Sequence, residues 1–407
     1  MNDSQPQLHL KPWAGPKLPE FVALMAALMA APALAIDAML PALPAIGESL
    51  AVAEENERQL VVTAFLLGFG LSQIFYGPLS DRLGRKTILT ASLLAYGAMA
   101  LASALAASFP WLLAARFGQG MAAAGLRVLV ISIVRDRFEG AGMARVMSLT
   151  FIVFMIIPVL APAFGQAVLW VAEWRFIFIG LGAYAAAVLG WALIRLPETH
   201  PPERRRPLSF AKVREALATI LGERLSIGNT LALTLVMGAL FGFINSIQQI
   251  TGDAFGRPEL LALVFAAIAG PMALSSWLNS RIVERLGSRP IMLAALGLFA
   301  ALSAVHLAAT LTLGTSLSSF ILMLAVTLGS FGLIAANLGA TAMQPLGHIA
   351  GTGSAVQGLI TTTGGALIGL AIGQAYAGSP IPLLAGFTLC GTAALAVALW
   401  ANRERPG

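Results

Sequence analysis

Asp37 and Arg116 are ionisable residues whose types and positions could do chemistry inside a largely apolar chain. Of 19 acidic residues, Asp37 is the only one that the sequence pattern places within a membrane span, near the outer end of the first apolar run. Arg116 enters the fourth run from the same side, so the two side chains are expected at similar depth. Burial and a nearby guanidinium act in opposite directions on the charge of a carboxyl group, and their balance changes with hydration or with an occupant. The pair predicts a proton-coupling site, and a static ion pair that joins two helices is the alternative.

Arg127 follows Arg116 by eleven residues. On a helix this spacing is about three turns, or roughly 16 Å, and it keeps both side chains on nearly the same face. A cation within a bilayer is costly, so we expect Arg127 to line an aqueous cavity, where it either attracts an anionic or electronegative substrate or repels cations. Extension of its side chain toward the membrane surface, without any functional part, is the alternative.

Membrane helices must position these residues. Hydrophobic residues make up 58% of the 407 residues, charged residues make up only 11%, and the mean hydropathy is +0.82, which excludes an ordinary soluble domain. Runs of about 20 apolar residues can cross a bilayer, and backbone groups in lipid need internal partners, so such runs form helices. We predict an all-α membrane protein with twelve transmembrane helices in two pseudo-symmetric six-helix bundles. The spans are approximately 20–40, 59–79, 88–107, 111–134, 146–168, 175–195, 226–249, 259–280, 290–310, 318–341, 352–377 and 381–401.

The longest polar connection is expected to divide the chain. It separates an N-terminal bundle, residues 1–195, from a C-terminal bundle, residues 226–407. The linker, residues 196–225, begins with prolines and an arginine cluster and then places apolar residues at helical spacing. This pattern indicates an amphipathic helix at the cytoplasmic surface of the membrane.

Basic residues mark one side of the predicted bundle. The net charge of +6 could suggest nucleic-acid binding, but with the N-terminus inside, only Arg58, Arg175 and Arg257 fall in loops on the outer side. The positive-inside rule then places both termini in the cytoplasm, in a bacterial inner membrane, and explains the charge by topology. Residues 33–35 resemble a signal-peptidase site, but cleavage would invert eleven further spans, so we expect the first span to be kept. The single cysteine, Cys390, excludes an intramolecular disulfide.

A repeated loop sequence indicates that the bundle is duplicated. Residues 77–86 read Gly-Pro-Leu-Ser-Asp-Arg-Leu-Gly-Arg-Lys, and a degenerate copy, Glu-Arg-Leu-Gly-Ser-Arg, returns at 284–289. Gly77 would let its helix approach a neighbour closely, and Asp81 could cap the facing eleventh helix in one state.

Two prolines are expected to bend the fifth run. Pro158 and Pro162 each remove a backbone donor, and the small residues around them suit an interface between the two halves. A kinked packing helix without further consequence is the alternative.

Several segments together resemble a known family. They are 37–44, 77–86, Arg-Phe-Gly-Gln-Gly at 116–120 and Pro-Val-Leu-Ala-Pro-Ala-Phe-Gly at 158–165, with added weight from 134–137 and 196–199. Over nearly its whole length the chain resembles Bcr/CflA-type drug:proton antiporters of the major facilitator superfamily. The resemblance implies that Asp37 and Arg116 take part in proton and drug coupling, and that the loop motif stabilises the outward-facing state at a cytoplasmic gate. The implied gating residues are Gly77, Asp81, Arg82, Gly84, Arg85, Pro158, Pro162 and Gly165.

The chain departs from the family pattern at a few positions. The antiporter signature usually has glycines where this chain has Ala161 and Gln166, which suggests looser packing of the fifth helix. Family members commonly carry an arginine where this chain has Ile131, and Arg127, one turn earlier, is a candidate substitute. The second acid that related transporters often carry in the first helix is absent, which argues against coupling through two carboxylates.

Amide, aromatic, methionine and arginine side chains in the predicted spans are the candidates for substrate contacts, because a drug cavity needs apolar walls and a few polar anchors. They are Met29, Arg127, Phe151, Phe154, Phe241, Asn245, Gln248, Asn337 and Gln357. Buried amides also need hydrogen-bond partners, so bonds between neighbouring helices are the alternative for each amide.

The resemblance implies a proton-coupled antiporter that exports small, largely apolar drugs, such as phenicols or bicyclomycin, by alternating access. A proton-coupled importer of a small organic nutrient has the same fold and is the alternative. The expected partners are drug molecules, protons and membrane lipid, without nucleic acid, and we expect a monomer. No metal or other cofactor is expected, because the proton gradient drives transport. The sequence has no phosphate-binding Gly-x-x-x-x-Gly-Lys loop, no Gly-x-Ser-x-Gly element and only scattered histidines, so it is not expected to be an enzyme.

Overall fold

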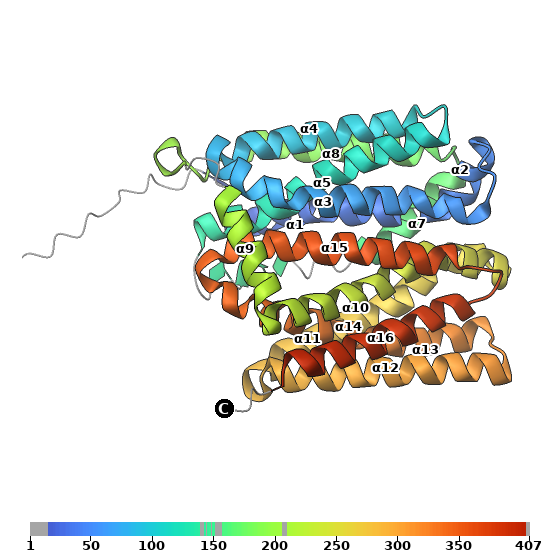
Figure 1. Ribbon diagram of the computed structural model, residues 1–407. Helices are drawn as coiled ribbons and strands as arrows, with labels where there is room; N and C mark the ends of the chain where they lie inside the picture. Colours follow the sequence, from blue (N-terminus) through green and yellow to red (C-terminus); the bar gives the residue numbers. More distant parts are fainter. Residues whose placement is uncertain are drawn as a thin grey trace, which may run out of the picture.

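The computed structural model describes residues 15–138, 142–143, 145–147, 149–150, 157–205 and 210–403. Within these ranges the chain is a bundle of long helices that lie roughly parallel or antiparallel to one another (Figure 1). The described residues contain no strand. The predicted all-α class is therefore confirmed.

The helices of the first half carry most of the predicted site. They are α1 (Leu18–Asp37), η1 (Leu40–Ala42), α2 (Leu43–Ser49), η2 (Glu55–Gln59), α3 (Leu60–Leu83), α4 (Arg85–Ala104), α5 (Phe109–Arg137), α7 (Ile157–Leu169) and α8 (Arg175–Arg195). The linker contains η3 (Pro202–Arg204) and α9 (Phe210–Gly222).

The second half repeats this pattern of long helices. They are α10 (Arg224–Gln249), η4 (Ile250–Ala254), η5 (Pro258–Leu260), α11 (Leu261–Leu286), α12 (Ser288–Leu313), α13 (Leu317–Gly329), α14 (Phe331–Met343), η6 (Gln344–Ile349), α15 (Ala350–Gln374) and α16 (Ile381–Ala401).

The helices match the predicted membrane spans. In the described residues, 11 helical segments are long and apolar enough to cross a membrane. The shorter apolar helix α7 lies where the fifth span is predicted, and residues 151–156 of that run lie outside the described residues. The predicted twelve-helix membrane fold is therefore confirmed.

The first span is longer than the sequence suggests. The expected end was near residue 40, but the apolar segment runs from Leu18 to Ser49, with a break directly after Asp37. Pro41 and Pro44 do not end the span, because each lies in the first turn of a new short helix, where proline has no backbone donor to lose. Asp37 consequently lies inside the span at a helix break.

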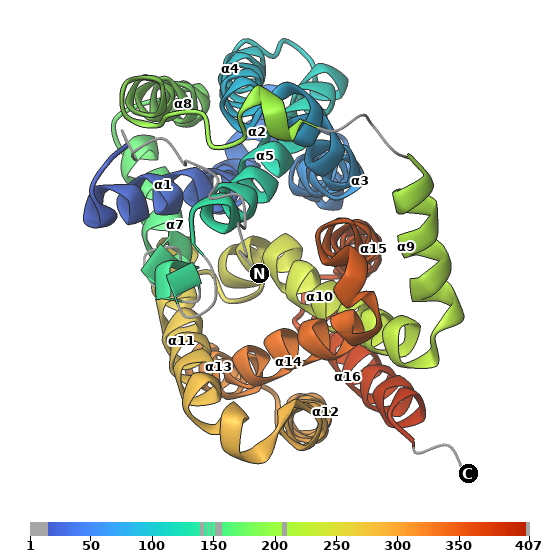
Figure 2. The ribbon, with the colours of Figure 1, turned by 90° about the vertical axis from the view of Figure 1, so that its left-hand side faces the viewer.

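The two halves lie on opposite sides of the molecule when it is viewed down the bundle. Figure 2 shows α3, α4, α5 and α8 in the upper part, α10, α12, α14 and α16 in the lower part, and α9 along one edge. Contacts between the halves join α3 to α15 and α7 to α11. The linker helix α9 buries Ala216 and Ile220 against Leu346 and Val356, so its apolar face packs on protein.

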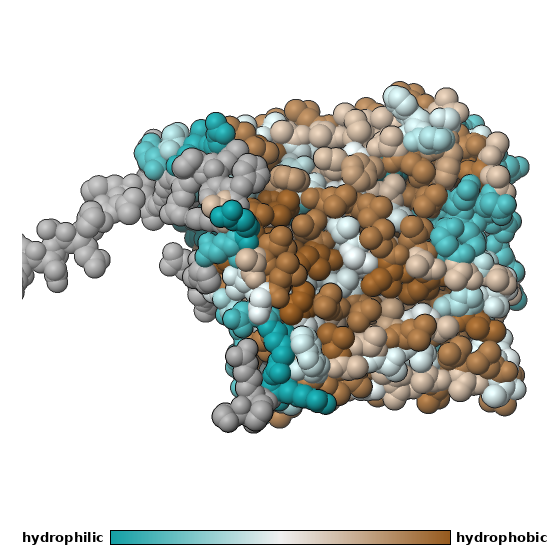
Figure 3. Space-filling model, viewed as in Figure 1, coloured by the Kyte–Doolittle hydropathy of each residue, from teal (hydrophilic) through white to brown (hydrophobic). Residues whose placement is uncertain are grey.

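Hydrophilic residues gather at the two ends of the molecule, and a largely apolar band separates them (Figure 3). We call the end that carries the loops after α3 and α11, together with α9, the basic end. The end that carries η2 and Tyr376 is the opposite end. Both loop repeats at the basic end turn on a glycine with positive φ, Gly84 at 97° and Gly287 at 80°, a conformation that other residues rarely adopt.

Candidate functional site

Side chains of neighbouring helices hold α1 through its backbone. The hydroxyl of Tyr184 donates to the carbonyl oxygen of Ala27 at 2.7 Å, and the hydroxyl of Tyr96 donates to that of Ala31 at 2.9 Å. Alanines four residues apart share one face of a helix, and their small side chains leave the carbonyl groups within reach. No sequence motif points to either tyrosine.

Arg116 on α5 holds the next position on this face. Its guanidinium donates to the carbonyl oxygen of Ala35 at 2.8 Å, to that of Val61 at 3.2 Å and to the side-chain oxygen of Gln119 at 2.6 Å. The ring of Phe65 lies 4.6 Å from the guanidinium carbon, and the Arg116 side chain is fully buried. Arg116 therefore joins α1, α3 and α5.

The expected ion pair between Asp37 and Arg116 is not formed. Asp37 is buried, and within the described ranges neither a hydrogen bond nor an ion pair involves its carboxyl group. Residues 35 and 37 differ by about 200° around a helix, so the guanidinium that bonds to Ala35 lies on the other face of α1 from Asp37. The expected pairing of the two side chains was therefore wrong. The proton-coupling role of both residues stays a prediction.

The predicted antiporter-signature segment lies beside Asp37. A Cβ atom on Gly165 would lie 1.8 Å from the carbonyl oxygen of Ala38, the residue after Asp37. Only glycine allows this approach of α7 to the break in the first span. Pro162 is buried in the same helix and Pro158 is half-buried. The structure thus brings Gly165 to the helix break beside Asp37.

Arg127 is exposed although it lies well inside α5. Trp111 near the start of α5 is 57% exposed, and a residue sixteen positions later lies about 160° further round the helix. Arg127 therefore faces nearly away from the surface that Trp111 presents, and its guanidinium carbon lies 5.9 Å from the ring of the buried Phe69 on α3. No acidic side chain in the described ranges pairs with it. An exposed, inward-facing guanidinium is suited to a water-filled space within the bundle.

Most of the predicted substrate amides bond to other helices. Asn337 on α14 donates to the side-chain oxygen of Asn279 on α11 at 2.6 Å, and Gln357 on α15 donates to the carbonyl oxygen of Gly339 at 3.5 Å. Asn245 on α10 donates to the hydroxyl of Thr63 on α3 at 3.4 Å. These contacts favour the alternative in which the amides join neighbouring helices.

The other predicted substrate residues have different surroundings. Gln248 is buried, and no partner for its side-chain oxygen occurs among the described residues. Phe241 is half-buried and packs on α15, whereas Met29 is buried in the core. Phe151 and Phe154 lie outside the described residues.

A hydrogen-bond cluster that no sequence motif predicts closes the opposite end. The amide of Asn56 donates to the carbonyl oxygens of Gln374, at 3.1 Å, and Tyr376, at 2.9 Å. In return, Gln374 donates to the carbonyl oxygen of Asn56 at 2.7 Å. Gln249 donates to the side-chain oxygen of Asn56 at 2.8 Å. Gln59 also donates to Gln249 at 2.5 Å. These bonds connect the two halves, and the only sequence signal was a set of amides at the ends of predicted spans.

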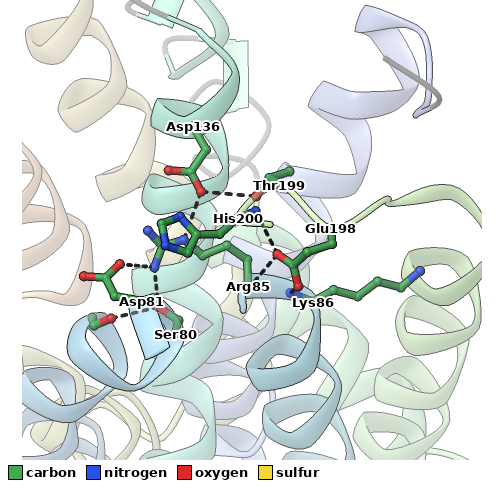
Figure 4. A network of polar contacts seen from close by, with 9 residues as sticks. Ser80, Asp81, Arg85, Lys86, Asp136, Glu198, Thr199 and His200 are labelled. Carbon is green, nitrogen blue, oxygen red and sulfur yellow. Dashed lines mark hydrogen bonds and ion pairs between the residues drawn. The ribbon is translucent and has the colours of Figure 1, made fainter. Parts of the chain in front are cut away.

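Arg85 is the centre of a charged network at the basic end (Figure 4). Its guanidinium contacts the carboxylate of Asp81 at 2.6 Å, that of Asp136 at 2.9 Å and the hydroxyl of Ser80 at 2.6 Å. The Arg85 side chain is 3% exposed, whereas that of Asp81 is 41% exposed. Two acids thus compensate one buried cation. Asp81 does not cap the eleventh helix here, because it pairs with Arg85, four residues along its own chain segment.

Glu198, from the segment after α8, caps the start of α4. Its carboxylate accepts from the backbone N–H groups of Arg85 at 2.9 Å and Lys86 at 3.1 Å (Figure 4). A carboxylate at a helix N-terminus satisfies free donors and interacts favourably with the helix dipole. A side chain on Gly84 would collide with this carboxylate, because its Cβ would lie 2.5 Å away. Arg82, in the same loop, is exposed.

Gly77 does not make the close helix contact that we expected. A Cβ atom there would meet nothing within 4 Å. The approach of α3 to α15 lies nearer the opposite end, where Gln73 donates to the hydroxyl of Thr362 at 3.2 Å. Gly77 is one turn beyond Gln73 toward the basic end and makes no close contact with a neighbouring helix.

Comparison with known proteins identifies the family. Residues 23–370 match the sequence model of the Major Facilitator Superfamily. The chain belongs to this superfamily. It is 28% identical over 373 residues to a bicyclomycin resistance protein homolog of Haemophilus influenzae, covering 91% of this chain and 93% of the relative. It is 29% identical over 339 residues to the multidrug resistance protein MdtL of Escherichia coli, covering 82% and 83%.

The crystal structure of the human organic anion transporter MFSD10 has the same fold, with a TM-score of 0.71, 21% identity and coverage of 95% of this chain and 100% of that chain. The protein is thus a multi-pass membrane transporter of the major facilitator superfamily and not an enzyme, as expected. The described residues contain no cluster of histidine, cysteine and acidic side chains that could hold a metal ion.

Proposed function

We propose that this transporter is a proton-coupled antiporter that exports small, largely apolar drugs from the cytoplasm. The observation that carries the proposal is the position of Asp37, a buried carboxyl group at a helix break, packed beside α7. An ionisable residue within a membrane span is costly and commonly marks a proton or substrate pathway. The names of the multidrug and bicyclomycin resistance relatives support the substrate class.

In this proposal the protein lies in a bacterial inner membrane. Its basic end faces the cytoplasm, as the positive-inside rule requires. The hydrogen-bond cluster around Asn56 then closes the external side. A closed external side suits a transporter that takes up its substrate from the cytoplasm.

Protonation of Asp37 is the proposed coupling step. A charged carboxylate needs water or a partner, so the charged form favours a state in which the external side is open to Asp37. A proton that binds from outside makes the group neutral and lets the external side close. When the drug binds from the cytoplasm, Asp37 releases its proton to the cytoplasm. The charged carboxylate then returns the transporter, with its drug, to the outward-facing state. At 100 mV, one charge supplies about 2.3 kcal/mol, enough to concentrate a drug well over tenfold without a nucleotide or another cofactor.

Arg127 and the apolar helix faces would shape the drug site. The exposed guanidinium can attract an electronegative group of the drug, while the neighbouring Phe69 ring supplies apolar surface. Phenicols and bicyclomycin-like compounds combine such polar groups with an uncharged body.

Drug accumulation in energised cells tests this function. Cells that express the chain are screened with phenicols, bicyclomycin-like compounds, sulfonamides and lipophilic cations, with and without an uncoupler. We expect lower accumulation of at least one compound, and the uncoupler should abolish the difference. Accumulation that rises with expression and collapses with the uncoupler would instead show a proton-coupled importer.

A further inference from the structure

Gln248 has an acceptor that the hydrogen bonds of the opposite end leave unused. Its side chain is 5% exposed, and the side-chain oxygen is buried without a hydrogen-bond partner among the described residues. The next residue, Gln249, accepts from Gln59 and donates to Asn56 in the cluster that joins the two halves. The oxygen of Gln248 lies outside that cluster. A buried amide oxygen without a donor is unfavourable, so a donor supplied by a ligand would stabilise it.

The face of α10 that carries Gln248 is otherwise apolar. Met237, Phe241 and Ile244 precede it at spacings of three and four residues, which keep all four side chains on one face of the helix. These three residues are half-buried, whereas Asn245, on the adjoining face, is fully buried against α3. Figure 2 shows α10 on the side of the second half that faces the first half. An apolar face with one polar acceptor at its closed end has the composition of a ligand-binding wall.

The duplicated fold places Gln248 where the first half has Asp37. The helices α1 and α10 are the first long helices of their halves. The α-helix α1 ends at Asp37, and α10 changes after Gln249 into η4, which is a π-helix. Short π-helical turns are rare and are frequent at functional sites. Asp37 and Gln248 thus lie in the last turns of corresponding helices, where the first can carry a proton and the second is a neutral acceptor.

We propose that Gln248 accepts a hydrogen bond from a hydroxyl or N–H group of the exported drug, so that the transporter selects donor-bearing drugs over equally apolar ones. The inference rests on the proposed function, because the drug must enter the bundle from the basic end to reach this face of α10. The apolar body of the drug packs on Met237, Phe241 and Ile244. A drug that lacks the donor leaves the oxygen of Gln248 unpaired and therefore binds more weakly.

A pair of glutamine variants separates this role from a structural one. Gln248→Met keeps the length of the side chain but removes the acceptor oxygen. Gln357→Met is the matched control, because Gln357 is also a buried glutamine of the second half, but its side chain already donates to the carbonyl oxygen of Gly339 at 3.5 Å. Replacing an unpaired oxygen loses no hydrogen bond, so Gln248→Met should unfold at the temperature of the intact chain or above it. A lower unfolding temperature would overturn the premise that this oxygen is unpaired.

Equilibrium binding to the purified full chain in detergent tests the inference. The probes are two phenicols that differ at one position, where a hydroxyl group of the first is replaced by fluorine in the second. Fluorine preserves the apolar body of the drug but cannot donate a hydrogen bond. We expect the intact chain and Gln357→Met to bind the hydroxyl compound about tenfold more tightly than the fluorine compound, and Gln248→Met to bind both compounds equally.

Several results would overturn the inference. A preference for the hydroxyl compound that persists in Gln248→Met would assign the acceptor to another residue. Equal binding of both compounds by the intact chain would show that the drug does not donate to Gln248, and failure of both to bind would exclude the site for phenicols. Binding at equilibrium needs no proton gradient, so these results differ from failure of the proposed function, which is the absence of uncoupler-sensitive export in the accumulation assay.

Discussion

Arg116 on α5 donates a hydrogen bond of 2.8 Å to the carbonyl oxygen of Ala35 on α1, two residues before Asp37. The guanidinium therefore supports the helix that carries the acid without neutralising it. This arrangement separates two tasks that an ion pair would combine. Arg116 fixes the position of α1, and in the proposed mechanism Asp37 exchanges a proton at the helix break.

Arg116→Lys should destabilise the transporter although it keeps the charge. A lysine ammonium cannot reach Ala35, Val61 and Gln119 together, because it lacks the planar fork of donors. Hydrogen bonds to charged groups contribute about 1.5–3 kcal/mol each, so we expect a clearly lower unfolding temperature in detergent. The exposed Arg127 is the matched control, and Arg127→Lys should unfold near the temperature of the intact chain. Equal unfolding temperatures for Arg116→Lys, Arg127→Lys and the intact chain would contradict a stabilising role of the hydrogen bonds that Arg116 donates.

Gly165→Ala should impair transport, because the new methyl group would collide with the backbone at Ala38. Its Cβ would lie 1.8 Å from a carbonyl oxygen, and a backbone atom cannot rotate away as a side chain can. The control is Gly190→Ala on α8, where a Cβ meets nothing within 4 Å. We expect normal expression of both variants and at least a several-fold loss of drug export only in Gly165→Ala. Full export by that variant would show that the contact of α7 with the helix break is dispensable.

A reversible crosslink at the opposite end should arrest transport. Asn56 and Gln374 come from different halves and exchange hydrogen bonds, so Asn56→Cys with Gln374→Cys should trap the closed end under oxidation. The background is Cys390→Ala, which removes the single native cysteine. Transport assays before and after a reducing agent check whether the arrest is reversible.

The control crosslink stays within one half. Glu20 on α1 and Arg195 on α8 form an ion pair of 2.6 Å near the basic end. Oxidation of Glu20→Cys with Arg195→Cys should leave transport unchanged, because alternating access moves one half against the other. Unimpaired transport by the crosslinked pair at residues 56 and 374 would exclude opening at that end.

Arg127→Gln should change selectivity for substrate charge. The exposed guanidinium is expected to attract electronegative groups, so its loss should weaken transport of anionic or strongly electronegative drugs by about tenfold, which is the effect of one charge-assisted hydrogen bond. Arg127→Lys should retain most of the preference. Competition of charged and neutral analogues against one labelled drug measures the difference. An unchanged ranking of the analogues would place Arg127 outside the drug site.

The sequence was sufficient for the fold because length and apolar composition determine membrane helices almost directly. It also placed Pro162, Gly165 and Asp37 in helices that do meet. It failed at contacts that depend on rotation about a helix axis, such as Arg116 with Ala35 instead of Asp37. Carbonyl acceptors cannot be recognised from residue types, and Asn56 donates to carbonyl groups of Gln374 and Tyr376, more than 300 residues away, where no local pattern points to them.

Reconstituted transport by Asp37→Asn tests the central claim most directly. Asparagine keeps the shape of the side chain but cannot carry a proton, and Glu48→Gln, at an exposed acid further along the same span, is the control. We predict that Asp37→Asn vesicles still exchange labelled for unlabelled drug but no longer accumulate drug when a proton gradient is imposed, whereas Glu48→Gln vesicles do both. Gradient-driven accumulation by Asp37→Asn at the rate of the intact chain would contradict the account and place proton coupling elsewhere.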